Sequence, residues 1–282
     1  MLFVDHVTKK FNDTIVLDDI TLEFENGVYG LLAPNGAGKT TLMRMIATLS
    51  FPTSGEITWN GADIISLDEK YRDILGYLPQ KFGYYRNYTP KQFLQYISAL
   101  KGLEPSYAAQ RIETLMEDVG LSDVMNKKMK NFSGGMLQRV GIAQALLNDP
   151  RIIIFDEPTA GLDPKERVRF RNMLRQLADN SIVILSTHIV SDIETIADKV
   201  VMLKDHRVFC YDTPDNICNM INGKIFEVAP GANISVPHKL LSERHRSDGT
   251  IMRIYSEEPV IGAAPAAADL EDVFLSVYSD EL

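Results

Sequence analysis

Cysteine and tryptophan are nearly absent from this 282-residue sequence, which holds two cysteines, Cys210 and Cys218, and one tryptophan. Two cysteines cannot build a disulfide framework, and these two lack the spacing of a zinc site, so we expect reduced thiols. No apolar run approaches the length of about 18 residues that a membrane-spanning helix needs. The N-terminus carries an acid at Asp5 and no long apolar stretch, which argues against a signal peptide. The sequence therefore predicts a soluble protein that reaches a membrane only through another chain.

An excess of basic charge is also missing. The 38 acidic side chains outnumber the 29 basic ones, and the net charge is −9. Because no basic excess exists to neutralise phosphates, we predict that nucleic acid is not a partner. The hydrophobic share of 45% and the charged share of 24% are those of a globular protein, which excludes wholesale disorder. The length suits one large domain, or a domain of about 200 residues with an appendage.

Strand-like and helix-like segments alternate along most of the chain. Residues 152–155 and 181–186 are short and almost continuously apolar, as in strands buried on both faces of a parallel sheet. Thr89-Pro-Lys-Gln92 and Asp163-Pro-Lys-Glu166 are predicted to cap helices, and helical pattern covers much of residues 89–147. This alternation predicts an α/β fold with a largely parallel core sheet and helices on its faces.

The pattern weakens from about residue 224, where Pro230-Gly231 and an alanine-rich stretch at residues 262–268 interrupt it. The segment 224–282 holds ten acidic and five basic residues, a net charge of −5 that is more than half of the excess of the whole chain. We therefore predict a main domain at residues 1–217 and a small, separate acidic module at residues 224–282.

A glycine-rich loop at residues 33–40 reads Ala-Pro-Asn-Gly-Ala-Gly-Lys-Thr and lies between a predicted strand and a predicted helix. Small residues let backbone N–H groups surround phosphates there, at the positive end of the helix, so this is a phosphate-binding loop. Lys39 adds a mobile positive charge, and the Thr40 hydroxyl can ligate Mg²⁺. Ala33 replaces the first glycine of the motif, which is tolerable if its φ is negative. The predicted nucleotide-binding residues of this segment are Ala33, Pro34, Asn35, Gly36, Ala37, Gly38, Lys39, Thr40 and Thr41.

Two adjacent carboxylates, Asp156 and Glu157, follow the buried run Ile152–Phe155. A parallel sheet binds its ligands at the carboxyl edge of its strands, which is where both acids are delivered. We predict that Asp156 holds Mg²⁺ and that Glu157, which points elsewhere, polarises a water toward the γ-phosphate. Adjacent acids after a strand are otherwise often a solvated turn, but the phosphate-binding loop favours the catalytic interpretation.

Ser133-Gly134-Gly135 precedes a predicted helix and offers a second helix N-terminus that can receive an anion. With this segment, residues 1 to about 217 resemble the nucleotide-binding subunit of an ATP-binding cassette (ABC) transporter. The resemblance also rests on Phe11, on Gln80 at the end of Gly76-Tyr-Leu-Pro-Gln80, on the turn Ala160-Gly-Leu-Asp163, and on His188. The sequence departs from the family's usual signature at Phe132, where leucine is usual, and at Met136, where glutamine is usual.

The resemblance implies a P-loop NTPase cassette in which an antiparallel β subdomain and an α-helical signature subdomain join the core sheet. It implies ATP and Mg²⁺ as cofactors and ATP hydrolysis coupled to transport as the activity. Phe11 would stack on adenine, Gln80 would contact Mg²⁺ or the attacking water, and His188 would sense the γ-phosphate. The implied catalytic residues are Glu157, His188 and Gln80, and the implied metal-binding residues are Thr40, Gln80 and Asp156.

The resemblance further implies that two cassettes, either two copies or one copy and a paralogue, face each other head to tail. Each ATP would lie between one phosphate-binding loop and the other cassette's Ser133-Gly134-Gly135, with Asp163 spanning the interface. A separate transmembrane permease chain would dock near residues 80–100, which places the protein at the cytoplasmic face of the cell membrane.

Residues 81–88 hold four aromatic side chains directly before the helix cap at Thr89. Exposed aromatics are typical of interface hot spots, so we predict that Tyr84, Tyr85 or Tyr88 fills a pocket against the permease. The alternative is that these rings pack over the helical region.

Other functions fit less well. A non-transport ABC ATPase of the translation type resembles two cassettes on one chain, and the DNA-repair type needs a long coiled coil, for which the 53 positions from Gln80 to Ser133 leave no room. A P-loop kinase or GTPase would not account for Ser133-Gly134-Gly135 and His188. Among transporters, Leu270-Glu-Asp-Val-Phe-Leu275 resembles the ending of drug, antibiotic and sodium exporter ATPases, and the tail of about 60 residues is short for a sugar importer. We predict export, with import as the alternative; the cargo is chosen by the membrane chain.

Overall fold

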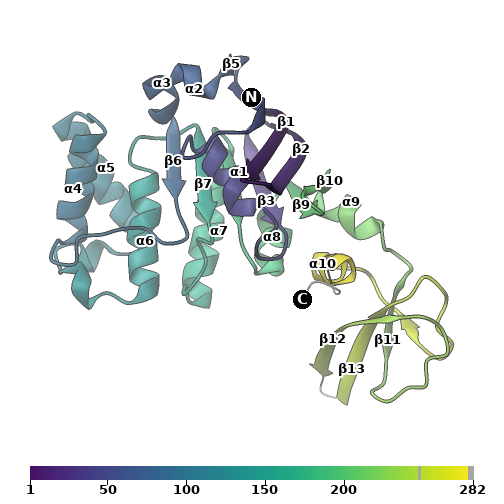
Figure 1. The fold of residues 1–282 in the computed structure, drawn as a ribbon. Coiled ribbons are helices and arrows are strands. Elements are labelled where there is room, and N and C mark those ends of the chain that lie inside the picture. Colours follow the sequence, from purple (N-terminus) through teal and green to yellow (C-terminus); the bar gives the residue numbers. More distant parts are fainter. Residues whose placement is uncertain (247–248, 279–282) are drawn as a thin grey trace.

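The computed structural model describes residues 1–246 and 249–278 and contains three β-sheets with helices around them (Figure 1). The central sheet has six strands in the order β10 (Arg207–Asp212), β9 (Lys199–Lys204), β3 (Gly27–Leu32), β8 (Ile182–Ser186), β7 (Ile152–Asp156) and β6 (Leu75–Leu78). All neighbouring pairs are parallel except β9 and β10, which form an antiparallel hairpin. The α/β fold with a largely parallel core sheet is thus confirmed.

The central strands are buried on both faces, as their continuous apolar runs predict. In β7, Ile152 and Ile154 belong to the apolar cluster on one face, whereas Ile153 and Phe155 belong to the cluster on the other. Because successive side chains of a strand point to opposite faces, each run of apolar residues serves two layers at once.

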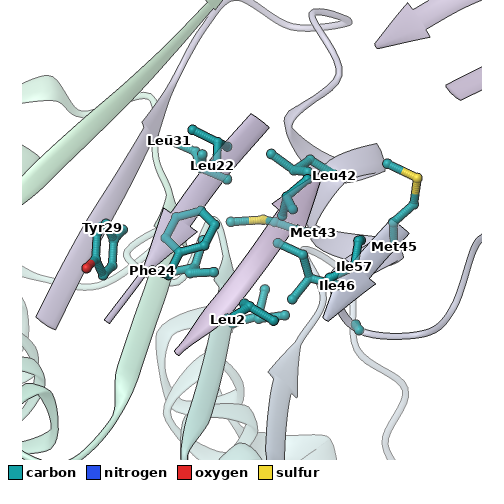
Figure 2. Packing of buried hydrophobic residues seen from close by; sticks show 14 of the residues in the cluster. Leu2, Leu22, Phe24, Tyr29, Leu31, Leu42, Met43, Met45, Ile46 and Ile57 are labelled. Carbon is teal, nitrogen blue, oxygen red and sulfur yellow. The ribbon is translucent and has the colours of Figure 1, made fainter. Parts of the chain in front are cut away.

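An antiparallel sheet covers the first face together with α1 (Lys39–Ile46). Its strand order is β2 (Thr14–Phe24), β1 (Leu2–Phe11), β4 (Ser54–Trp59) and β5 (Ala62–Asp63), and two short helices follow, α2 (Ile64–Leu67) and α3 (Glu69–Arg72). Figure 2 shows how Leu22 and Phe24 of β2 meet Leu42, Met43 and Ile46 of α1 in this layer. The packing fixes α1, and with it the loop that precedes α1, against the central sheet.

The second face carries α7 (Pro164–Ala178) and a helical subdomain that consists of α4 (Pro90–Leu100), α5 (Pro105–Asp118), two short 3₁₀ turns (Ser122–Val124 and Met129–Asn131) and α6 (Gly134–Ala145). The predicted capping box at the start of α4 is present, because Thr89 Oγ1 accepts from the Gln92 N–H at 3.2 Å and Gln92 Oε1 accepts from the Thr89 N–H at 3.0 Å. None of the described helices combines the length and the apolar character that crossing a membrane requires.

The C-terminal segment adds a third sheet in the order β12 (Lys239–Arg246), β13 (Gly249–Tyr255), β11 (Ile225–Val228) and β14 (Ala264–Pro265). Its closing helix, α10 (Leu270–Tyr278), does not stay with that sheet alone. Leu270 and Val273 share an apolar cluster with Leu32 of β3 and with Val190 and Ile193 of α8 (Val190–Ile196), and α9 (Pro214–Asn219) completes this cluster. The division into residues 1–217 and 224–282 stays a prediction, and the closing helix bridges its two parts.

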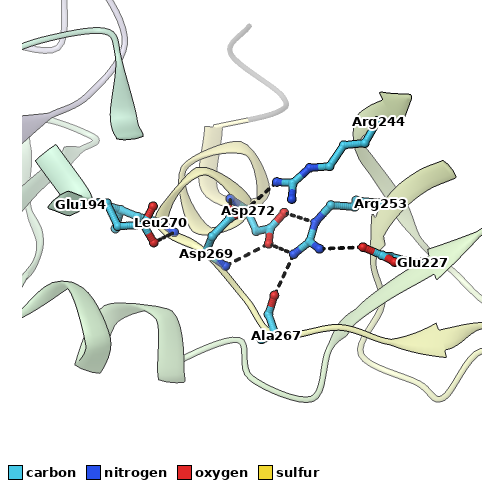
Figure 3. A network of polar contacts seen from close by, with 8 residues as sticks. All are labelled: Glu194, Glu227, Arg244, Arg253, Ala267, Asp269, Leu270 and Asp272. Atoms are coloured by element: carbon cyan, nitrogen blue, oxygen red, sulfur yellow. Dashed lines mark hydrogen bonds and ion pairs between the residues drawn. The ribbon is translucent and has the colours of Figure 1, made fainter. Parts of the chain in front are cut away.

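A buried polar network holds α10 against the third sheet (Figure 3). Arg253 of β13, 4% exposed, forms an ion pair with Asp272, 1% exposed, and donates to Glu227 Oε1 at 3.1 Å. On the other side, the Leu270 N–H donates to Glu194 Oε1 of α8 at 3.1 Å. Removing one partner of a buried ion pair leaves an uncompensated charge, so we expect that loss of either Arg253 or Asp272 would destabilise the contact between α10 and the sheet.

Candidate nucleotide site

The loop at residues 33–38 joins the carboxyl end of β3 to α1, and its backbone needs glycine at two positions. Gly36 has φ 88° and Gly38 has φ 102°, both in the left-handed region that side chains disfavour. A Cβ atom on Gly38 would also lie 2.6 Å from Leu17 Cδ2 and 3.0 Å from the backbone oxygen of Val16, so a larger residue would be strained there and Leu17 would have to shift. Ala33, in contrast, is buried and keeps a φ outside that region, which explains why alanine is tolerated at the first position.

A cavity of about 140 Å³ lies beside this loop at the carboxyl edge of the central sheet. The loop after β3, the start of α1, the loop after β6 and the end of β7 bring together nine residues that the sequence had singled out: Asn35, Gly36, Gly38, Lys39, Thr40, Thr41, Gln80, Asp156 and Glu157. Ala33, Pro34 and Ala37 belong to the same loop but do not line the cavity. A parallel sheet whose strands end at one edge accounts for this convergence of segments that are far apart in the sequence.

Lys39 provides the positive charge of the cavity, although its side chain is buried. Its ammonium group donates to the backbone oxygens of Ala33 and Pro34, the latter at 3.0 Å. Burial lowers the pKa of Lys39, and the nearby carboxylates of Glu157 and Asp156 oppose this shift. The ammonium group thus folds back onto its own loop, next to the space in which an anion would be received.

Asp156 is 2% exposed and is held by hydroxyl groups from two other segments. Thr40 Oγ1 donates to Asp156 Oδ2 at 3.0 Å, and Ser186 Oγ donates to Asp156 Oδ1 at 2.6 Å. With Gln80 lining the same cavity, these residues offer a hydroxyl, a carboxylate and an amide oxygen. Mg²⁺ prefers such oxygen donors and takes few of them from protein, so the residues fit this ion.

Glu157 is 8% exposed and has a left-handed backbone, with φ 55°. Its carboxylate Oε2 lies 2.7 Å from Nδ1 of His188, which follows β8. Its N–H donates to the backbone oxygen of Ser186 at 3.1 Å and to Ser186 Oγ at 3.2 Å, and its own backbone oxygen accepts from Gln138 Nε2 at 3.2 Å. The structure therefore joins Glu157 and His188, which the sequence named, to Ser186 and Gln138, which sequence reasoning missed.

The remaining sequence-predicted residues do not line the cavity. Ser133 and Gly134 are exposed at the start of α6, where Ser133 Oγ accepts from the Met136 N–H at 3.2 Å. Asp163 is exposed at the start of α7 and accepts from the Glu166 N–H at 2.9 Å. Phe11 ends β1, half-exposed, with the Lys9 ammonium 4.8 Å from its ring centroid.

The predicted capping box at Asp163 is only half formed. The Glu166 carboxylate turns away from the Asp163 N–H and lies 3.2 Å from Arg139 of α6. A charged partner from the helical subdomain replaces the local backbone partner that the sequence pattern predicted, because a charge-assisted contact is stronger than a contact to a neutral backbone N–H.

Comparison with known proteins identifies the family. A sequence profile described as "ABC transporter" matches residues 17–160. The chain belongs to the ABC transporter ATP-binding proteins. It is 38% identical over 215 residues to the ABC transporter ATP-binding protein NatA of Bacillus subtilis, covering 74% of this chain and 87% of that protein. It is 30% identical over 292 residues to the Nod factor export ATP-binding protein I of Cupriavidus pinatubonensis, covering 98% and 90%.

A solved structure gives the same result. A dimeric bacterial ABC transporter cassette aligns with a TM-score of 0.69 and 27% identity over 76% of this chain and 98% of that cassette, which was also solved bound to ADP and Pi. The predicted family, fold and ATPase activity are therefore confirmed: this ABC protein binds and hydrolyses ATP as the ATP-binding subunit of a transporter.

Replacing Lys39 by alanine is expected to weaken ATP binding by about 10- to 100-fold, because charge-assisted hydrogen bonds contribute about 1.5–3 kcal/mol each. Isothermal titration of the monomer with a non-hydrolysable ATP analogue measures the change. Lys127→Ala, an exposed lysine of the helical subdomain, is the control and should bind as the wild type does. Unchanged affinity in Lys39→Ala would remove the phosphate-binding role of the loop.

Proposed function

We propose that this chain is the ATP-hydrolysing subunit of an exporter, and that two cassettes close head to tail around two ATP molecules. One observation carries the proposal: the cavity collects the phosphate-binding loop, Asp156 and Glu157, whereas Ser133 and Gly134 are exposed and lie outside it. An exposed helix N-terminus can receive an anion, and because this one lies outside the chain's own cavity, it suits a nucleotide held by a second cassette. The dimeric state of the related bacterial cassette supports the same arrangement.

Each ATP site would then consist of residues from one cassette and residues from the second cassette. Lys39 and the N–H groups of the loop bind the phosphates, and Thr40, Asp156 and Gln80 hold Mg²⁺, which when bound supplies charge neutralisation. Glu157 would orient the attacking water, and His188, whose Nδ1 lies 2.7 Å from the Glu157 carboxylate, would sense the γ-phosphate. Ser133, Gly134 and Gly135 of the second cassette close the site, Asp163 spans the interface, and Phe11 stacks on adenine. Fixed donors and charges of this kind stabilise the transferred phosphoryl group.

The permease is proposed to dock where two adjacent hollows meet at Arg72 and Lys101. The larger, of about 690 Å³, is lined among others by Leu100 and Asp73, and the other reaches Leu49. Leu49 and Leu100 are both more than half exposed, and the exposed charged residues Arg72 and Asp73 line the same hollows. Exposed apolar side chains with charged neighbours suit a helix of a membrane chain, which would hold the subunit at the cytoplasmic face of the membrane.

The aromatic stretch at residues 81–88, a second part of the proposed docking surface, divides into two parts. Phe82 and Tyr84 pack against the core of the helical subdomain, so Tyr84 is not free to enter a partner. Tyr85 and Tyr88 are 50% and 39% exposed and stack on each other at 5.0 Å between ring centroids. The backbone of this stretch is tied to the signature, because Tyr88 accepts from the Met129 N–H at 2.9 Å. A movement of this stretch on permease binding would therefore be transmitted to the segment directly before Ser133.

Replacing Tyr85 and Tyr88 together by serine is expected to release the subunit from its permease while ATPase activity of the free subunit stays near wild type. Aromatic pairs contribute about 0.5–1.5 kcal/mol each, and Tyr85 pairs with Tyr88, Phe93 and Tyr96. The melting temperature is therefore measured beside binding, and the release should occur while the variant is still folded. Co-purification with a tagged permease measures the loss. Phe209→Ser, a half-exposed ring on β10, is the matched control and should still co-purify. Full-stoichiometry binding by the double variant would contradict docking at these rings.

Export is supported by the tail. The match to the Nod factor export protein covers 98% of the chain and therefore includes most of residues 224–278. The direction can be tested without knowing the cargo, by comparing metabolites inside and outside cells that carry the wild-type chain or an inactive Glu157→Gln variant. We expect at least one compound to accumulate in the variant cells and to disappear from their medium. The opposite redistribution would show import.

A further inference from the structure

The signature helix α6 touches the loop at residues 157–163 at two points. At the first, α6 lies directly on the turn, since a Cβ atom on Gly135 would be only 2.5 Å from the backbone oxygen of Gly161. At the second, Gln138 donates from Nε2 to the backbone oxygen of Glu157 at 3.2 Å, and its side chain is buried. The loop begins with Glu157 and ends with Asp163, which both belong to the proposed ATP sites, so α6 contacts the first residue of the loop and the turn shortly before its last residue.

Glu157 depends on such contacts because its backbone is strained. A left-handed conformation of a residue with a side chain costs about 1–2 kcal/mol, and surrounding contacts must supply that energy. Ser186 holds the N–H of Glu157 from the β8 side, and Gln138 holds its carbonyl oxygen from the α6 side. The direction of the Glu157 carboxylate follows from this backbone, so both contacts help to set where the carboxylate points.

We propose that Gln138 is a positioning residue: it links the signature helix to the orientation of the Glu157 carboxylate in the same chain. This rests on the proposed head-to-tail dimer, in which the start of α6 meets the ATP of the second cassette. Ser133 and Gln138 lie little more than one turn apart on one rigid helix, so a shift at Ser133 moves Gln138 with it. When Ser133 binds the ATP of the second cassette, Gln138 thus orients Glu157 for hydrolysis of the ATP in its own chain. Hydrolysis at the two sites is therefore coupled.

The first test is Gln138→Met, which keeps the volume of the side chain and removes its N–H donor. We expect kcat to fall about tenfold, which corresponds to the loss of one hydrogen bond, while KM and the affinity of the monomer for ATP stay within about twofold. Gln110→Met, an exposed glutamine of α5, is the matched control and should leave both constants unchanged. An unchanged kcat in Gln138→Met overturns the proposal. If this variant melts early, Gln138→Asn replaces it, since it keeps the amide but cannot reach Glu157, and the same fall in kcat is expected.

The second test separates this proposal from the dimer on which it rests. In a Glu157→Gln background, ATP should drive dimer formation equally well with Gln138 or with Met at that position, as measured by size-exclusion chromatography. Loss of the dimer only in the double variant would assign Gln138 to the interface and overturn its role toward Glu157. If Glu157→Gln alone forms no dimer, the head-to-tail arrangement fails, and the kcat measurement still decides whether Gln138 positions Glu157 within one chain.

Discussion

Replacing Glu157 by glutamine is expected to lower ATP turnover by about 100-fold or more, because this removes the charge that we propose orients the attacking water. Glutamine has almost the same shape, and the phosphate-binding loop, Lys39 and Asp156 remain in place. ATP should therefore bind with nearly wild-type affinity. The 2.7 Å contact between the Glu157 carboxylate and His188 Nδ1 shows that the group lost is one the site holds closely.

The same variant should accumulate as the closed dimer, because ATP can still bring two cassettes together but is no longer hydrolysed at an appreciable rate. Size-exclusion chromatography with ATP and Mg²⁺ should show a dimer for Glu157→Gln and mostly monomer for the wild type after turnover. Glu117→Gln, an exposed carboxylate on α5, serves as the control and should hydrolyse ATP normally. Normal turnover in Glu157→Gln would remove Glu157 from catalysis, whereas low turnover without a dimer would contradict the two-cassette site.

The parts of the site that could be predicted from sequence are those in which a local pattern carries its own geometry. Gly36 and Gly38 mark a loop with left-handed backbone, and the run Ile152–Phe155 marks a strand whose end delivers Asp156 and Glu157. Because parallel strands end at one edge, the order of the elements was enough to predict that the two segments meet. The cavity at that edge contains all of these residues except Ile152–Phe155 itself.

The parts that could not be predicted depend on contacts between segments that are distant in the sequence. Ser186 reads as the last residue of an apolar strand, and only the pairing of β7 with β8 places its hydroxyl on Asp156. Nothing near Tyr84 and Tyr85 distinguishes the ring that packs from the ring that is exposed. Similarly, no local pattern in the tail predicted that the apolar residues of α10 would pack on α8.

The trans role of Ser133 can be decided by placing two substitutions either on different chains or on one chain of a mixed dimer. Ser133→Arg puts a large cation where a phosphate should arrive, and Glu157→Gln stops hydrolysis without preventing binding. When every chain carries Ser133→Arg, ATP should still bind to the monomer as in the wild type. Dimerisation and ATP hydrolysis should both be lost. Ser122→Arg, an exposed serine in the same subdomain, is the control and should do neither.

Mixed dimers, isolated through two different affinity tags, then give opposite results for the two arrangements. If the signature acts in trans, a Ser133→Arg chain paired with a Glu157→Gln chain keeps one intact site, formed by the first chain's phosphate-binding loop and the second chain's signature. A chain with both substitutions paired with a wild-type chain keeps none. If each signature served its own nucleotide, the first pair would be inactive and the second would hydrolyse ATP. We expect hydrolysis in the first pair alone. Ser133 lies outside the cavity that holds Lys39 and Glu157 of its own chain, so a bulky cation at position 133 should disrupt the ATP site of the other chain and not the site of its own chain.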